Sequence, residues 1–450
     1  MKTSSITRRE FLAAAGVGAV GLTAVGRLAL GQAAAIAPTG KPLNILLILA
    51  DDLGYHDLGC YGSTLVETPA IDRLAKEGLR FTNAYAACPV CSPTRASILT
   101  GKYPARLHLT DFIPGKEAAD EKLLIPDWTK RLVPEEVTLA EVLKAAGYRT
   151  GIIGKWHLEG KPADHGFDED PVPNHAPKRG EPDLTRQQAQ TAAAFIERHK
   201  EQPFFCYLSF NAVHAPMVPR EELLKKYEAK VRPGTKPGAA YLAVTEEMDR
   251  AIDLVLKKID DLGLRDRTLV VFMSDNGGFM GTTTNAPLRG FKGQLYEGGI
   301  RVPLIVRWPG VVKPGTTSDA VVTSADQYPT LLEIAHAPGD AKHNAGVDGR
   351  SLVPLLKGGA APQRSAVYWH YPHYHAGKPS GAVRSGDWKL IEFYEDSRVE
   401  LYNLKDDPVE TKDLAQTNAP KAKELQGLLA NWRTSVGAQM PTANSSYKAK

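Results

Sequence analysis

Several short runs of almost uninterrupted apolar residues constrain the fold of this chain more than any other feature of its sequence. The first run, residues 43–50, reads Leu-Asn-Ile-Leu-Leu-Ile-Leu-Ala. A strand covered by helices on both faces shows no polar alternation, so this pattern is typical of a parallel strand inside an α/β sheet. Similar runs follow at residues 150–154, 203–209, 268–274 and 302–306.

Helical patterns lie between these runs, at residues 68–77, 138–146, 184–199 and 240–262. The alternation predicts an α/β fold with a large mixed, mostly parallel sheet flanked by helices.

Near residue 366 the rhythm changes to short alternating strands, at 382–394 and 399–403, followed by a helix at about 420–434. This pattern predicts a smaller C-terminal antiparallel sheet with one helix. We therefore expect an α/β domain at residues 38–365, an antiparallel subdomain at 366–440 and a disordered tail at 441–450.

The composition excludes several classes of protein. The 55 Lys and Arg against 51 Asp and Glu leave a formal charge of only +4, with no concentrated basic stripe, which argues against a nucleic-acid binder. Four cysteines in 450 residues are too few for a disulfide scaffold. No internal stretch reaches the roughly 18 apolar residues of a membrane span, so we expect no stable span in the mature protein.

The first residues are typical of an export signal rather than of a folded element. Thr7-Arg8-Arg9-Glu10-Phe11-Leu12 precedes an apolar run, rich in Ala and Gly, that extends to about Leu30. Paired arginines before a mildly hydrophobic core predict a twin-arginine signal peptide at residues 1–31. The chain would then be exported folded, by the twin-arginine translocation machinery, to the periplasm or beyond. An ordinary secretory signal or an N-terminal membrane anchor is the alternative.

Two pairs of polar residues follow predicted strands directly. Asp51 and Asp52 follow the first apolar run, and Asp275 and Asn276 follow the run that ends at residue 274. Ligands of open α/β sheets bind beyond the carboxyl ends of the strands, so these four side chains can converge. Carboxylate and amide oxygens suit Ca²⁺ or Mg²⁺, although such a pair after a strand is also a common helix cap or turn.

The segment Cys91-Ser92-Pro93-Thr94-Arg95 identifies a family. It lies within Val-Cys-Ser-Pro-Thr-Arg-Ala-Ser-Ile-Leu-Thr-Gly, residues 90–101, and resembles the type I sulfatases of the alkaline-phosphatase-like superfamily. In that family the Cys of a Cys-x-Pro-x-Arg core is oxidised to formylglycine. By chance the same string would be a turn into a helix with an inert, buried cysteine.

The resemblance covers essentially the whole mature chain. Its further elements are Gly154-Lys-Trp-His157, Asn211-Ala-Val-His-Ala-Pro216, Ser274-Asp-Asn-Gly-Gly278, Leu288-Arg-Gly-Phe-Lys292, Tyr296-Glu-Gly-Gly-Ile-Arg301, Gly386-Asp-Trp-Lys-Leu390 and Glu400-Leu-Tyr-Asn403.

The resemblance implies a role for each matching residue. One divalent cation, Ca²⁺ with Mg²⁺ as the alternative, would be held by Asp51, Asp52, Cys91, Asp275 and Asn276. Cys91, oxidised by a formylglycine-generating enzyme, would supply the hydrated aldehyde that attacks sulfur. The catalytic set would be completed by Arg95, which orients the nucleophile, Lys155 and Lys292 on the sulfate, His157 on the diol, and His214, which protonates the leaving alcohol. Asp275 would accept the proton of the attacking hydroxyl.

Other residues leave their roles open. Cys88 and Cys91 form a Cys-x-x-Cys pair, but with no second pair Cys88 is interpreted as structural. The stretch 368–375, Tyr-Trp-His-Tyr-Pro-His-Tyr-His, either lines a sugar-binding pocket or is a packed loop between the two domains. His108, Asp111 and the loop 158–183 are further candidates for the pocket.

The sequence thus favours a secreted sulfuric-ester hydrolase acting on sulfated carbohydrates, with aryl sulfates as further substrates. Two alternatives stay open: a phosphomonoester or phosphodiester hydrolase of the same superfamily, and a non-catalytic polysaccharide-binding protein if Cys91 is never oxidised.

Overall fold

The computed structural model describes residues 42–170 and 183–448, and the chain from Leu43 onward forms one compact unit. The predicted signal peptide, residues 1–31, lies outside the described residues, as do residues 171–182 of the predicted loop 158–183. No helix in the described part is long and apolar enough to cross a bilayer.

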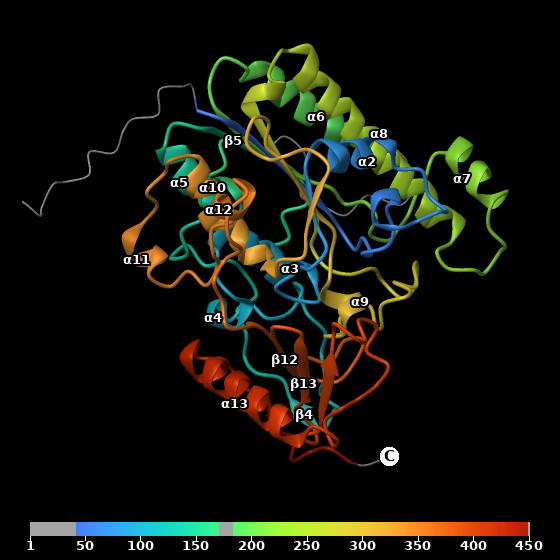
Figure 1. The fold of residues 1–450 in the computed structure, drawn as a ribbon, viewed down its shortest axis with the longest axis vertical. Coiled ribbons are helices and arrows are strands. Elements are labelled where there is room, and N and C mark those ends of the chain that lie inside the picture. Colours follow the sequence, from blue (N-terminus) through green and yellow to red (C-terminus); the bar gives the residue numbers. More distant parts are fainter. Residues whose placement is uncertain (1–41, 171–182, 449–450) are drawn as a thin grey trace, which may run out of the picture. The chain divides into compact units, whose positions relative to one another are not determined.

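A seven-stranded sheet forms the centre of the chain (Figure 1). Its order is β5 (Arg149–Gly154), β6 (Phe204–Ser209), β1 (Asn44–Ala50), β7 (Thr268–Ser274), β8 (Leu304–Arg307), β2 (Leu79–Phe81) and β9 (Thr316–Ser318). The pairs β5·β6, β6·β1, β1·β7 and β2·β9 are parallel, whereas β8 is antiparallel to both neighbours. The predicted mixed, mostly parallel sheet is therefore confirmed.

Strand β8 departs from the interpretation of its apolar run as a parallel strand. A strand buried on both faces has the same composition in either direction, so the run 302–306 predicts burial but not orientation.

Helices cover both faces of this sheet, and the alternation within β1 shows how the two cores divide. Ile45, Leu47 and Leu49 pack into one core with apolar residues of α3 (Cys91–Thr100), α5 (Leu139–Ala145) and α10 (Gln327–Ile334). Leu46, Ile48 and Ala50 pack into the other core with residues of α2 (Pro69–Glu77), α6 (Leu184–Arg198) and α8 (Ala239–Asp261). The period of two in a strand sends successive side chains to opposite faces, and both faces are apolar here because both are covered.

The helices are α2 (Pro69–Glu77), α3 (Cys91–Thr100), α4 (Pro104–Leu107), α5 (Leu139–Ala145), α6 (Leu184–Arg198), α7 (Glu221–Glu228), α8 (Ala239–Asp261), α9 (Glu297–Ile300), α10 (Gln327–Ile334), α11 (Ala341–Asn344), α12 (Val353–Leu356) and α13 (Ala419–Ser435). Helices α2, α5, α6 and α8 match the four predicted ranges to within one residue at each end. The start of α5 illustrates why: Thr138 and Glu141 form a capping box, which is readable from sequence.

The C-terminal part contains an antiparallel sheet of β11 (Val367–Tyr371), β12 (Ser380–Ser385), β13 (Trp388–Phe393) and β14 (Val399–Asn403), in that order. The run 382–394, predicted as one strand, is a hairpin that turns at Gly386, whose φ is +57°. Apolar residues of α13, among them Leu425 and Leu429, pack on this sheet. The predicted small antiparallel sheet with a terminal helix is confirmed.

The predicted disordered tail is ordered in part. Within it, β15 (Thr442–Ala443) pairs with β4 (Leu123–Leu124), and the Asn444 side chain donates to the carbonyls of Ala119 and Glu121. The pairing partner lies more than 300 residues away, so local composition could not predict it. A second short pair joins β3 (Ala84–Tyr85) to β10 (Val322–Thr323).

A buried ion pair connects the C-terminal sheet to α9, which lies in the preceding α/β part of the chain. Lys389 of β13 is fully buried, and its Nζ lies 2.9 Å from a carboxylate oxygen of Glu297 and 2.9 Å from one of Glu410. The predicted boundary at residue 365 therefore separates two sheets but not two compact units.

Candidate active site

The predicted carboxylates meet at one edge of the central sheet. Asp51 follows β1 and Asp275 follows β7, and because these strands are parallel neighbours the two residues end side by side. Asp51, Asp275 and Asn276 are fully buried, and Asp52 nearly so. Asp52 has a positive φ of 61°, a conformation that is uncommon outside glycine and concentrated at functional sites.

Contacts between the two pairs hold the four side chains in place. The Asp52 backbone N–H donates to Oδ1 of Asp275 at 3.2 Å, and Nδ2 of Asn276 donates to Oδ1 of Asp52 at 2.8 Å. Burial raises the pKa of Asp275 to about 6, and the neighbouring Asp51 adds to this shift. Burial acts in the same sense on Asp51, but Lys155, His214 and Arg95 overcome it and hold the pKa of Asp51 well below its usual range.

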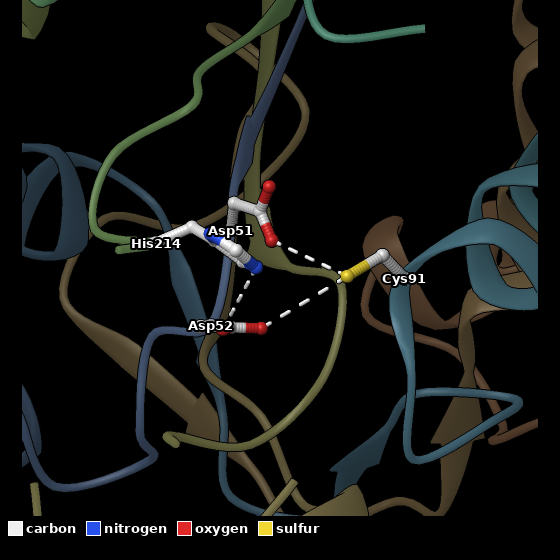
Figure 2. A group of neighbouring side chains, drawn as sticks. All are labelled: Asp51, Asp52, Cys91 and His214. Carbon is white, nitrogen blue, oxygen red and sulfur yellow. Dashed lines mark hydrogen bonds and ion pairs between the residues drawn. The ribbon is translucent and has the colours of Figure 1, made fainter. Parts of the chain in front are cut away.

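Cys91 is the first residue of α3, opposite these carboxylates (Figure 2). Its Sγ lies 3.5 Å from Oδ1 of Asp51 and 4.0 Å from Oδ1 of Asp52, and the residue is 1% exposed. Burial, reinforced by Asp51, raises the pKa of the Cys91 thiol to about 12. An unmodified Cys91 would therefore be a neutral thiol at physiological pH, which is a weak nucleophile and a poor ligand for a hard cation.

Arg95 lies one helical turn after Cys91 and is 1% exposed. Its Nε and Nη2 donate to Oδ2 of Asp275 at 3.0 and 2.8 Å. Its Nη1 donates to Oγ of Ser209 at 2.6 Å and to the Lys155 carbonyl at 3.0 Å. The guanidinium thus joins the ends of β5, β6 and β7 to the helix that carries Cys91.

Two lysines neutralise the aspartate pair. Nζ of Lys155 pairs with Asp51, and Nζ of Lys292 lies 2.7 Å from Oδ1 of Asp52. Burial would lower the pKa of Lys292, but Asp52 overcomes it and the pKa is raised; Asp51 does the same for Lys155. Both ammonium groups therefore stay charged beside Cys91, where an anionic substrate group would meet them.

The two predicted histidines occupy different environments. His157 is largely buried, and its Nε2 lies 2.6 Å from the carbonyl oxygen of Ile113; burial, with Lys155, lowers its pKa to about 3. His214 has a side chain that is 39% exposed, with Nε2 3.6 Å from Oδ2 of Asp52. His157 is therefore a neutral imidazole near pH 7. His214 is partly exposed and lies beside the carboxylates, as Figure 2 shows.

The site has the donors that a divalent cation requires. Ligand atoms of Asp51, Asp52, Cys91 and His214 lie within 4.8 Å of one another, and all but His214 are buried. Among the described residues, Oδ1 of Asn276 is buried without a hydrogen-bond partner. A buried acceptor of this kind needs a partner, and a cation held with Asp51, Asp52 and Asp275 would supply one. The predicted oxygen set therefore fits Ca²⁺ or Mg²⁺.

Ser209 was missed by the sequence reasoning. Its Oγ accepts from Arg95 and donates to the Lys155 carbonyl at 2.7 Å, so it fixes the guanidinium from the end of β6. The signal was available, because Ser209 ends one of the predicted apolar runs at the same sheet edge as Asp51 and Asp275.

The residues proposed for the pocket divide by burial. His373 is 1% exposed and its Nε2 lies 2.8 Å from Oγ1 of Thr110, while Asp111 is fully buried and accepts from the Tyr371 hydroxyl at 2.7 Å. Both side chains are packed inside the protein, and a pocket role for either stays a prediction. His375 is half-buried, packs edge-on against Phe112 and lies close enough to Lys292 for the ammonium to help burial lower its pKa to about 4.

The fold and this cluster define a class of hydrolase in which buried carboxylates, cationic side chains and one residue at a helix start surround an anionic group. Residues 43–337 match the family model named Sulfatase, and residues 291–434 match the model of the N-sulphoglucosamine sulphohydrolase C-terminal region.

Relatives agree with this assignment. A sulfatase of Formosa agariphila is 32% identical over 476 residues, covering 84% of this chain and 85% of the relative. Human arylsulfatase A is 35% identical over 417 residues, covering 81% of this chain and 77% of the relative. The crystal structure of Ps i-CgsB superposes with a TM-score of 0.77 at 26% identity, covering 90% of this chain and 95% of that one. The chain belongs to the type I sulfatases of the alkaline-phosphatase-like superfamily, and it is an enzyme that hydrolyses sulfate esters.

Proposed function

We propose that this sulfatase removes sulfate from sulfated carbohydrates, using a formylglycine made from Cys91 and one divalent cation, Ca²⁺ with Mg²⁺ as the alternative. The observation that carries the proposal is the position of Cys91: the first residue of α3, buried, 3.5 Å from Asp51 and flanked by two charged lysines. The sequence places the Cys-x-Pro-x-Arg core of the family at this point.

The solved structures of similar proteins support the substrate class. Ps i-CgsB has been solved in complex with a neocarrahexaose, at 26% identity and a TM-score of 0.77 to this chain. The protein BT4656 has been solved with its substrate D-glucosamine-2-N,6-O-disulfate, at 26% identity and a TM-score of 0.68. Both ligands are carbohydrates, and human N-acetylgalactosamine-6-sulfatase is 35% identical to this chain over 387 residues.

Asp51, Asp52, Asp275 and Asn276 would hold the cation, which when bound withdraws charge from the sulfate oxygens. The formylglycine would supply a hydrated aldehyde with two hydroxyl groups in place of the neutral thiol. Every remaining task falls to side chains of this chain.

Lys155 and Lys292 neutralise the aspartates before substrate arrives and present fixed positive charge to an incoming sulfate group. Asp275, whose pKa is raised toward neutrality by burial, accepts the proton of the attacking hydroxyl. Arg95 holds Asp275 in place for this transfer. His214, which is exposed on one side, donates a proton to the departing alcohol oxygen, and the neutral His157 accepts a hydrogen bond from the second hydroxyl.

Burial also constrains when Cys91 is modified. Cys91 is 1% exposed in the folded chain, so a formylglycine-generating enzyme must reach it before folding is complete. If the twin-arginine machinery exports the folded protein to the periplasm or outside the cell, oxidation takes place in the cytoplasm before translocation.

The test is free-sulfate release by the mature protein from sulfated mono-, oligo- and polysaccharides, with an aryl sulfate and an aryl phosphate beside them. We expect release from one sugar class, loss of at least about 10³-fold for Cys91→Ala, and near wild-type activity for the matched control Cys88→Ala, whose buried thiol lies 3.9 Å from the carbonyl oxygen of Thr110. The mass of the peptide containing Cys91 distinguishes an aldehyde from a thiol. Hydrolysis of the aryl phosphate with no hydrolysis of any sulfate ester, or full activity of Cys91→Ala, would overturn the proposal.

A further inference from the structure

A second charged cleft lies at the other end of the strands of the central sheet, away from Asp51 and Asp275. Its lining includes Lys76, Glu77, Arg265, Arg307 and Lys313, with the loop 309–314, around a volume of about 520 Å³. Arg307 ends β8 and pairs in register with Val270 of β7, five residues before Asp275. At about 3.3 Å per residue the cleft lies roughly 16 Å along the strand from the candidate active site.

Arg307 is the unusual residue of this cleft. It is 2% exposed, and its Nη1 lies 3.2 Å from Oε2 of Glu77. Among the described residues, its Nε and Nη2 have no hydrogen-bond partner. Two unsatisfied donors on one buried guanidinium cost free energy, and a planar pair of this kind matches two oxygens of one tetrahedral anion.

The charges around Arg307 favour the same ligand. Glu77 is shared, since Nη2 of Arg265 lies 2.8 Å from its Oε1. Asp260 pairs with Arg265 at 3.1 Å. Two carboxylates thus face four cationic side chains, because Lys76 and Lys313 also line the cleft. Burial lowers the pKa of Arg307; its hydrogen bond to Glu77 opposes this shift, and the neighbouring Arg265 adds to it.

We propose that this cleft is a second, non-catalytic binding site for a tetrahedral oxoanion, with Arg307 as its buried anchor and Lys76 and Lys313 at its rim. A sulfate group is a tetrahedral oxoanion that the guanidinium donors match, and the enzyme acts on sulfate esters. The oxoanion could come from a sulfate ester further along a sulfated sugar chain or from free inorganic sulfate. Only the first source rests on the proposed carbohydrate substrate; the existence of the site does not.

The experiment measures binding to the full mature chain carrying Cys91→Ala, which removes turnover. Isothermal calorimetry with inorganic sulfate at constant ionic strength gives the affinity and the number of sites. We expect Arg307→Gln to weaken one sulfate site by about tenfold, since charge-assisted hydrogen bonds are lost. Lys313→Glu should weaken it by about threefold, because an exposed ammonium acts as a screened point charge. The control Lys405→Glu, an exposed lysine of the C-terminal part, should leave it unchanged.

Repeating the titration with a carrageenan hexasaccharide separates the two sources. If Lys313→Glu weakens binding of the hexasaccharide, the site binds a sulfate ester of the sugar chain. If Lys313→Glu weakens binding of inorganic sulfate but not of the hexasaccharide, the site binds the free ion. If neither Arg307→Gln nor Lys313→Glu changes the affinity for sulfate, the proposal is wrong. Lys313→Glu keeps the test decisive if Arg307→Gln does not fold. The readout is binding, so failure of the proposed catalytic function leaves it intact.

Discussion

The substitution Arg95→Gln tests whether the Asp275 side of the active site depends on one buried ion pair. Arg95 donates four hydrogen bonds, two of them to Oδ2 of Asp275 at 3.0 and 2.8 Å. Both side chains are almost fully buried, at 1% and 0% exposed. Glutamine keeps a polar side chain but removes the positive charge and the forked pair of donors.

The expected cost follows from burial. Removing one partner of a buried ion pair leaves the other charge without compensation, which costs about 3–5 kcal/mol. Arg73 provides a matched control, because its Nη2 lies 2.7 Å from Asp253 with side chains 42% and 25% exposed. An exposed pair of the same chemistry contributes about 1 kcal/mol or less, so Arg73→Gln should cost at most that amount.

The assay is urea unfolding of the chelator-treated protein at pH 7.5, followed by circular dichroism, for the wild type and both variants. Comparable m-values would establish that the same transition is being measured. A cost for Arg95→Gln below about 1 kcal/mol, or equal costs for the two variants, would refute the reasoning that burial of this pair makes Arg95 indispensable.

Three further predictions concern separate parts of the chain. His214→Ala should lower kcat/KM on a sulfated sugar by about 10²-fold or more but on 4-nitrophenyl sulfate by less than about tenfold, since a nitrophenolate leaves without protonation; equal losses in steady-state assays would contradict the role of His214. Lys389→Met should lower the free energy of unfolding in urea by about 3–5 kcal/mol, because it removes the buried cation that Glu297 and Glu410 share; a cost under about 1 kcal/mol would show that these carboxyl groups are neutral without it. Burial lowers the pKa of His370 to about 4. Between about pH 6.5 and pH 4 the unfolded chain therefore binds a proton at His370 that the native chain does not bind, so the free energy of unfolding falls as pH drops. This effect of His370 should lower the free energy of unfolding by about 2 kcal/mol between pH 7 and pH 5. In urea titrations, His370→Gln should reduce the pH dependence of the free energy of unfolding by that amount. An unchanged pH dependence in the variant would contradict the prediction.

Much of the main domain could be predicted from local patterns. The four helices flanking the central sheet were predicted to within one residue because apolar periodicity and caps such as Thr138 act within a few residues. Asp51 and Asp275 were predicted to converge because parallel neighbours end at the same edge of a sheet. The Cys91 motif could be read directly, since it is contiguous in the chain.

Features that depend on distant partners could not be predicted in this way. The direction of β8, the pairing of β15 with β4 and the contact of Ser209 with Arg95 all join segments that are remote in sequence. The burial of His373 is of the same kind, because an aromatic stretch has the same composition whether it lines a pocket or is packed in a core.

The sequence by itself therefore determined the class of fold, the family and the candidate residues of the active site, since each is encoded by spacing along the chain. Tertiary structure alone decided the electrostatics. The pKa of Cys91, the pairing of Lys155 and Lys292 with the aspartates and the two unsatisfied donors of Arg307 arise from burial beside charges on other strands and helices. Desolvation and Coulomb interactions depend on distance in space, and only the folded chain sets those distances.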